Sequence, residues 1–385
     1  MRAAILLSLI VVAAAAPSPA INAADRQKQI SYITGILNVK ADPSWSTISD
    51  ADLADVFQQE LLSRSTAARQ AAAGNLKTTV TRRVTQSTDE VTQDVHDDLA
   101  THAYYMSAAY CLPFFVQTWT CGSRCRGPTD GTQVWKYFDK NILTQDVVGY
   151  VATNDNLNAI IVAYRGTLSP QNALVDIDLL YQSQPHSTFS SSLGPPANAF
   201  VHSGFQNAYQ ASASDVIGTI NDILSSDGFA DYEIHVVGHS MGGAIASIAT
   251  LDIISNFPNS VVKTYTYGQP RTGNKVWSDW YNTLPIVTSG NVSRVTHNVD
   301  PVPQVPLTCS NPELCYHHHN SPYFLPDYTY SDSAPVVACE SKAGEDVNCQ
   351  ATEAFVTLNP LQGGFDIGAH LIGYFDHNIL GFICL

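Results

Sequence analysis

Residues 232–249 read YEIHVVGHSMGGAIASIA, in which a strand pattern, a serine between glycines and a helix pattern follow one another directly. Its first six residues are typical of a buried strand, and the apolar, alanine-rich run after Met241 is typical of a helix. Between them, residues 238–242 form the pattern G-x-S-x-G, in which two glycines let the chain turn sharply and present the serine hydroxyl. The sequence therefore predicts that Ser240 is a nucleophile on a strand-to-helix turn. The alternative is an ordinary serine in a glycine-rich turn.

Helix and strand patterns alternate from Thr88 onward, which indicates one α/β domain over residues 84–385. A short turn at 154–156 predicts a hairpin before the sheet becomes parallel. The expected fold is of the α/β-hydrolase type, with a mostly parallel central sheet, flanking helices and a nucleophile elbow. The predicted helices are 89–110, 207–224 and the one that begins at Met241, and the predicted strands are 146–153, 159–164, 232–237, 262–267 and 293–296.

A serine hydroxyl is a weak nucleophile, so a histidine must take its proton and an acid must orient that histidine. In this fold the chain order is serine, acid, histidine. Asp300 follows a predicted strand and is followed by prolines, as expected of an active-site loop. Asp252 and Asp279 fall in predicted helices, so we expect them to be structural.

His370 lies late in the chain in GAHLIGYF (368–375), which makes it the expected base, with His377 as the second candidate. The run of three histidines at 317–319 invites a metal site. Adjacent side chains on an extended segment alternate in direction and rarely share one ion, so we expect the run at the surface or behind the site. No metal or organic cofactor is expected.

The tetrahedral intermediate of such a reaction needs preorganised donors, one of them the N–H of the residue after the nucleophile. That residue is Met241. Thr167 follows the strand predicted to end at Tyr164, so its N–H, together with its hydroxyl, is the expected second donor.

The first 24 residues have the features of a secretory signal peptide: one basic residue, an apolar run at 5–16 and small residues after it. The alternative is a membrane anchor, but the run is shorter than the roughly 20 residues that a span needs. We therefore expect a secreted, extracellular protein without stable membrane insertion.

Residues 25–83 hold no cysteine and end in Arg82-Arg83, so they are expected to form a removable propeptide. The alternative is a helical extension that stays attached. Residues 1–83 carry nine Lys+Arg against six Asp+Glu, whereas residues 84–385 carry ten against 28. So acidic a domain argues against nucleic acid as a partner.

The eight cysteines all lie between residues 111 and 384, and an even count in an exported chain suggests four disulfides. Many pairings are open. Proximity in sequence favours Cys121 with Cys125, Cys309 with Cys315 and Cys339 with Cys349, which leaves Cys111 and Cys384 to join the two ends. A zinc site is the rival interpretation, but a second close pair of suitable ligands is missing near Cys121. Asn291 begins the one Asn-x-Ser/Thr sequon and is a candidate glycosylation site.

Several motifs in this order resemble the fungal class 3 lipase family of extracellular triacylglycerol lipases. They are YC (110–111), IVAYRGT (161–167), VHSGF (201–205), GHSMGG (238–243), YGQPR (267–271), DPVP (300–303) and His370 with Tyr374. The resemblance implies the triad Ser240, Asp300 and His370, the oxyanion donors Thr167 and Met241, and a monomer that acts on lipid at an oil–water interface. It also implies the pairs Cys111–Cys384, Cys121–Cys125 and Cys339–Cys349, whereas Cys309–Cys315 departs from the family pattern.

Lipases of this family carry a short helical lid after the oxyanion loop. Here Ser169-Pro170 offers a helix start, and apolar residues follow at Leu174, Val175 and Ile177. The family's lid tryptophan is replaced by Ala173. The alternative is a helix packed permanently in the core.

The expected function is therefore hydrolysis of triacylglycerol esters through an acyl-enzyme. The first alternative is a feruloyl esterase on the same scaffold, for which the aliphatic lid is unsuited. The second is a catalytically silent lipid-binding protein, which would not need the apparent triad.

Overall fold

The structure is a computed structural model that describes residues 43–47, 90–142, 145–167, 182–183, 185, 192–297, 300–306, 311, 313, 315–320, 322–326, 335–339, 344–345, 370 and 374–375. The expected signal peptide and lid lie outside these ranges. So does the expected propeptide, apart from a short 3-10 turn at Pro43–Ser46. These three segments stay predictions.

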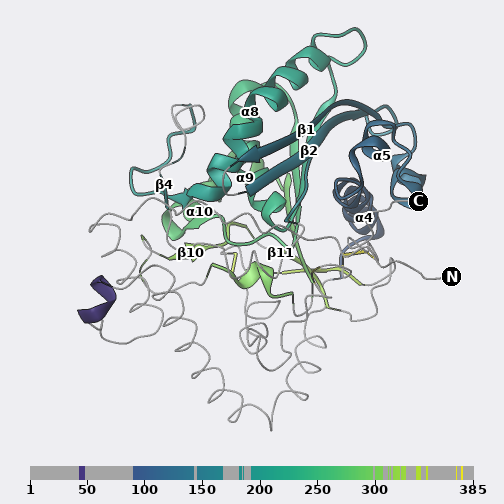
Figure 1. Cartoon of the computed structure of the whole chain (residues 1–385). Coiled ribbons are helices and arrows are strands. Elements are labelled where there is room, and N and C mark those ends of the chain that lie inside the picture. The colour runs from purple at the N-terminus through teal and green to yellow at the C-terminus, as the bar shows by residue number, and fades with distance from the viewer. Residues whose placement is uncertain are drawn as a thin grey trace, which may run out of the picture.

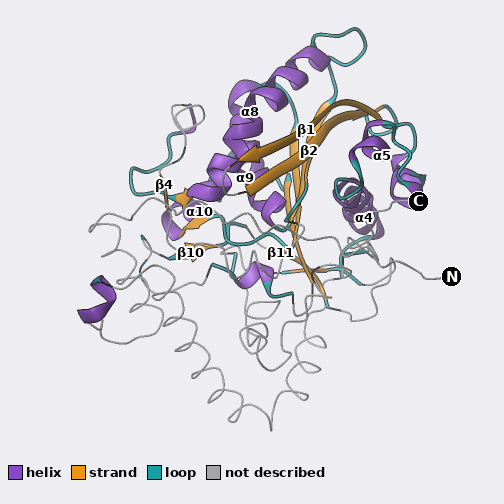
Figure 2. Cartoon of the chain, in the orientation of Figure 1, coloured by secondary structure: helices purple, strands orange, loops and turns teal. Residues whose placement is uncertain are grey.

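A central sheet of eight strands has the order β1-β2-β3-β6-β7-β9-β11-β12 (Figures 1 and 2). The strands β3, β6, β7, β9 and β11 run parallel, whereas β1, β2 and β12 join the sheet in antiparallel pairs. The predicted hairpin and mostly parallel sheet are therefore confirmed. The bounds are β1 Gln133–Ile142, β2 Gln145–Asn154, β3 Ala159–Tyr164, β6 Glu233–His239, β7 Val262–Tyr267, β9 Val292–His297, β11 Pro322–Leu325 and β12 Val337–Ala338.

Strand β3 shows why the sheet lies in the interior. All six of its residues are buried, and their side chains alternate between two hydrophobic clusters. Ile160 and Val162 pack into the first cluster, and Ile161 and Ala163 into the second. A strand that is apolar on both faces has to be covered on both faces, so helices are required on each side of the sheet.

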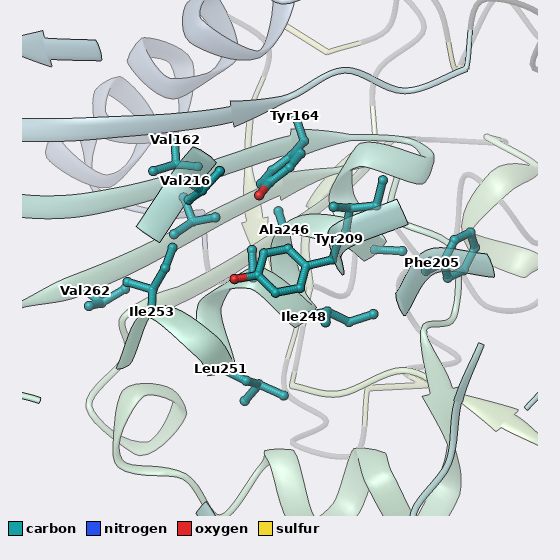
Figure 3. Close-up of a cluster of buried hydrophobic side chains, with 14 of the residues drawn as sticks. Val162, Tyr164, Phe205, Tyr209, Val216, Ala246, Ile248, Leu251, Ile253 and Val262 are labelled. Atoms are coloured by element: carbon teal, nitrogen blue, oxygen red, sulfur yellow. The ribbon is translucent and has the colours of Figure 1, made fainter. Parts of the chain in front are cut away.

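Helices α8 (Ser203–Leu224) and α9 (Met241–Asn256) cover the face of the first cluster. Helix α4 (Gln93–Ala108) covers the other face, on the opposite side of the sheet in Figure 1. Figure 3 shows the first cluster, in which Tyr209 of α8 lies among side chains of α9 and of the sheet. Helix α9 is buried almost all round, which explains its alanine-rich, uniformly apolar sequence.

The remaining elements are short. A second sheet has the order β10-β8-β5-β4, with bounds Tyr316–His317, Gly273–Asn274, Val201–His202 and Gln182–Ser183. The short helices are α5 Pro113–Gln117, α10 Lys275–Tyr281 and α11 Pro285–Thr288, and the 3-10 turns are η2 Gly122–Cys125, η3 Gly127–Thr129 and η4 Val302–Gln304. Within the described ranges, none of the helices is both long and apolar enough to cross a membrane.

A disulfide joins Cys121 to Cys125, at the two ends of the segment that carries η2. Cys111, Cys315 and Cys339 are also disulfide-bonded. Their partners lie outside the described residues, so the pairings expected for them stay predictions.

Candidate active site

Ser240 occupies the turn between β6 and α9, where the sequence places it. Its backbone has φ 57° and ψ −131°, a conformation that residues with a side chain rarely adopt. The turn is held on both sides: Ser240 N donates to the Tyr267 carbonyl at 2.9 Å, and Gly243 N donates to the Ser240 carbonyl at 2.9 Å. A strained residue fixed in this way is typical of a functional position.

The flanking glycines are required by the close approach of backbone to backbone. A Cβ at Gly238 would collide with the backbone of Gly242, and a Cβ at Gly242 would collide with the Tyr164 carbonyl at the end of β3. The glycines therefore let the start of α9 lie directly against the ends of β3 and β6.

Asp300 and His370 form a fully buried pair, with His370 Nδ1 2.9 Å from Asp300 Oδ2. Two further donors hold the carboxylate: the Tyr374 hydroxyl bonds Oδ2 at 2.6 Å, and the Val302 N–H bonds Oδ1 at 2.8 Å. Because a carboxylate accepts, the proton of the neutral imidazole is assigned to Nδ1. The other ring nitrogen, Nε2, has no hydrogen-bond partner among the described residues and keeps a free lone pair.

Gly268 makes room for this pair. Its φ is +58°, and a Cβ there would lie 2.8 Å from Asp300 Oδ2 and 2.9 Å from His370 Nδ1. In the sequence, Gly268 and Tyr374 are recognisable only as parts of motifs, Gly268 in residues 267–271 and Tyr374 together with His370. A glycine directly after β7 and a tyrosine four residues after His370 were the signals that could have indicated their contacts.

His239 connects Ser240 to the imidazole of His370. The ring of His239, the residue before Ser240, packs on the ring of His370 with centroids 4.3 Å apart. Within the described residues, His370 Nε2 forms no hydrogen bond with Ser240.

The loop after β3 approaches Ser240 closely. A Cβ at Gly166 would lie 2.6 Å from the Ser240 Cβ, so only glycine fits there. The Thr167 hydroxyl donates to the Met241 thioether at 3.6 Å. The structure thus brings Thr167 to the first residue of α9, where the helix N–H groups lack acceptors within the helix and attract negative charge.

An ion pair supports the loop that carries Asp300. Arg271 contacts both carboxylate oxygens of Glu345, at 2.7 and 2.8 Å, and also donates to the Pro306 carbonyl at 2.9 Å. Burial alone would raise the pKa of Glu345, but the Arg271 guanidinium outweighs burial and holds that pKa below its ordinary value. Residues 300–306 are therefore fixed to residues 344–345 through one guanidinium.

The three histidines at 317–319 lie behind this loop. His318 and His319 are buried, so a surface position is wrong for both. His318 Nε2 contacts the Pro303 carbonyl at 2.7 Å, and His319 Nε2 accepts from the Gln269 amide at 3.0 Å. Burial lowers the pKa of His319 to about 3 and the pKa of His318 well below its ordinary value. Among the described residues, no group of three or more metal-ligating side chains occurs.

Asp252 and Asp279 lie apart from the pair. Asp252 accepts from the Tyr209 hydroxyl at 2.6 Å within the core, and Asp279 forms an exposed ion pair with Lys275 at 2.7 Å. Asn291 is half-buried just before β9. His377 and the expected lid residues Leu174, Val175 and Ile177 are outside the described ranges, as are Cys309, Cys349 and Cys384.

Comparison with known proteins gives consistent matches. Residues 161–309 match the family described as lipase (class 3). Secreted mono- and diacylglycerol lipase A of Penicillium cyclopium is 28% identical over 198 residues, which cover 51% of this chain and 57% of the relative. Secreted mono- and diacylglycerol lipase 1 of Fusarium solani is 29% identical over 253 residues, covering 62% and 65%. The chain thus spans less than two thirds of the length of these relatives. The crystal structure of a lipase from Rhizopus microsporus var. chinensis has a TM-score of 0.61 at 26% identity, covering 77% of this chain and 92% of that chain.

We predict that Gly242→Ala destabilises the turn because the new methyl group meets the Tyr164 carbonyl. The expected cost is roughly 1–3 kcal/mol of unfolding free energy, measured by urea denaturation. Gly218→Ala is the matched control: Gly218 is exposed in α8 with open space at its Cβ, so the same substitution should stabilise by about 0.5–1 kcal/mol. Equal stability of the two variants would contradict the packing described for the turn.

We also predict that the Arg271–Glu345 pair makes stability dependent on acid. Because the folded pKa of Glu345 is lowered, its contribution is complete above the unfolded value near 4.5 and is lost as the pH falls through the folded pKa. Glu345→Gln should cost about 3 kcal/mol at neutral pH and flatten the fall in stability toward pH 3.

The control for that experiment is Asp279→Asn, which removes the carboxylate of an exposed ion pair and should change stability little at any pH. Stability curves for Glu345→Gln and the wild type that stay parallel between neutral pH and pH 3 would contradict the assignment.

Proposed function

Because the chain belongs to the class 3 lipase family, we propose that it hydrolyses carboxylic ester bonds of acylglycerols through Ser240. One observation carries the proposal: a buried Asp300–His370 pair leaves one imidazole nitrogen unbonded, and the imidazole packs on the residue that precedes a strained serine. A histidine oriented by a carboxylate can activate a hydroxyl, and this combination is what nucleophilic ester hydrolysis requires.

In the proposed mechanism, His370 Nε2 takes the proton of Ser240 Oγ as that oxygen attacks the ester carbonyl. The N–H groups of Met241 and Thr167 donate hydrogen bonds to the carbonyl oxygen and stabilise the negative charge that develops on it. His370 then gives the proton to the leaving alcohol oxygen, and an acyl ester remains on Ser240. A water molecule, deprotonated by the same nitrogen, attacks this ester and releases the fatty acid and the free serine.

Asp300 has two roles in this scheme. It holds the imidazole in the tautomer with the proton on Nδ1, and it stabilises the imidazolium that forms on each proton transfer. Hydrogen bonds from Tyr374 and Val302 support the carboxylate in both roles, because they occupy one lone pair on each of its oxygens and fix its plane.

For the substrate, we propose acylglycerols at an oil–water interface, with triacylglycerol included, and an extracellular site of action. Two of the relatives are named secreted mono- and diacylglycerol lipases, which supports an acylglycerol substrate and an extracellular site of action. The apolar residues Leu174, Val175 and Ile177 are proposed to form the lid, and His370 rather than His377 is the proposed base.

We predict that purified protein hydrolyses emulsified diacylglycerol and triacylglycerol faster than a soluble short-chain ester, and methyl ferulate least. Ser240→Ala should abolish all of these activities, because removing the nucleophile of such a triad costs about 10⁶-fold in kcat. Fatty-acid release titrated at constant pH provides the measurement.

Ser247→Ala is the matched control. Ser247 is a buried serine in α9, seven residues or about two helical turns beyond Ser240, and its hydroxyl donates to the Ala244 carbonyl. It should retain activity. Turnover confined to methyl ferulate would replace acylglycerols by a feruloyl ester as the substrate. If the wild type and Ser240→Ala bind lipid equally well and neither hydrolyses an ester, the protein is a lipid-binding protein and not an esterase.

A further inference from the structure

His239 is the first x of the G-x-S-x-G turn, between Gly238 and Ser240. Its side chain is completely buried, and both of its ring nitrogens have hydrogen-bond partners. His239 Nδ1 lies 2.6 Å from the Tyr110 hydroxyl, and His239 Nε2 lies 3.0 Å from the backbone carbonyl of His370. The proposed mechanism assigns no role to this imidazole. Its contacts nevertheless reach two separate parts of the site.

Donor and acceptor can be assigned for each hydrogen bond in the series that runs from the His370 carbonyl through His239 and Tyr110 to Gly166. The His370 carbonyl can only accept, so the proton of neutral His239 must be on Nε2. His239 Nδ1 is then an acceptor, and the Tyr110 hydroxyl must donate to it. The Tyr110 oxygen still has lone pairs, and one of them accepts the Gly166 N–H at 3.0 Å.

We propose that His239 is a positioning residue of the active site. The Tyr110 hydroxyl holds the His239 ring in the tautomer that has its proton on Nε2. Through this ring, hydrogen bonds connect the backbone of His370 to the loop that carries Thr167. This inference rests on the proposed ester hydrolysis. One end of the chain of bonds holds the backbone of the base, and the other end holds Gly166, whose α-carbon approaches Ser240. The distance between the base and the oxyanion loop is thereby fixed through a single ring.

The role requires an uncharged ring. Protonation of Nδ1 would remove the acceptor of the Tyr110 hydroxyl, and it would place a positive charge beside His370 just where His370 must become an imidazolium. Burial lowers the pKa of His239 well below its ordinary value, and the nearby His370 lowers it further. The other titratable group against the ring is Tyr374, whose ring centroid is 5.7 Å away. Among the described residues, no carboxylate bonds His239 to favour its charged form.

Tyr110→Phe tests this role because it keeps the aromatic ring and removes the hydroxyl that donates to His239 Nδ1. We expect kcat for a soluble ester to fall roughly 10- to 100-fold with little change in KM, since small displacements of catalytic groups have effects of that size. Tyr105→Phe is the matched control: Tyr105 is also buried near the end of α4, and its hydroxyl bonds Thr132, at 3.1 Å, and Asn154. It should leave kcat unchanged. Equal kcat values for the two variants would overturn the inference.

Nitrogen-15 NMR of the histidine side chains provides a readout that packing alone would not move. His239, assigned from the spectrum of His239→Gln, should show a neutral ring with the proton on Nε2 from about pH 5 to about pH 8, where an ordinary histidine titrates. The proton on Nδ1, or titration with an ordinary pKa, would overturn the inference. This result does not depend on turnover, so a wild-type protein that hydrolyses no ester would contradict the proposed function separately.

Substitution of His239 itself provides a rescue test. The side-chain amide of His239→Gln can still donate to the His370 carbonyl, whereas His239→Leu cannot. His239→Gln should therefore retain several-fold more kcat than His239→Leu. A kcat for His239→Leu that equals or exceeds the kcat for His239→Gln would contradict a hydrogen-bonding role.

Discussion

The backbone of Ser240 is strained, and the elements around it are arranged to hold it in that conformation. A positive φ at a residue with a side chain costs roughly 1–3 kcal/mol, so the surrounding structure has to hold it. The backbone of β7 and the first turn of α9 bond Ser240 on either side, and Gly238 and Gly242 let these backbones meet. The buried strand β6 and the apolar helix α9 follow from the same requirement, because only rigid, fully packed elements can hold such a turn.

The proposed catalytic groups come from segments that are distant in sequence, and buried polar contacts hold these segments together. Arg271 ties the loop after Asp300 to Glu345, and Tyr374 bonds the Asp300 carboxylate from the C-terminal end of the chain. In a buried site of low dielectric constant, such contacts are strong when complete and costly when one partner is missing. These contacts differ from His370 Nε2, which has no hydrogen-bond partner among the described residues and is the atom that the proposed mechanism uses.

Local patterns predicted the part of the fold that the motif controls. The hairpin before Tyr164, the strand before Ser240 and the helix after it follow from side-chain periodicity and glycine placement. Strand β1 was missed although it forms a hairpin with its sequence neighbour β2. The small second sheet was missed because its two-residue strands pair across segments that are distant in sequence. Helix α8 begins at Ser203, earlier than predicted, since the His202 ring caps it. The burial of His318 depends on the fold around the Asp300 loop, which side-chain polarity alone does not indicate.

Covalent labelling tests whether Ser240 is the activated nucleophile. A long-chain alkyl fluorophosphonate reacts with a serine only when a base activates that serine, and peptide mass mapping locates the adduct. We predict one adduct per molecule, on the peptide that contains Ser240, and its loss when His370 is replaced by alanine. Absence of an adduct on the wild-type protein, or an adduct on a different serine, would contradict the account.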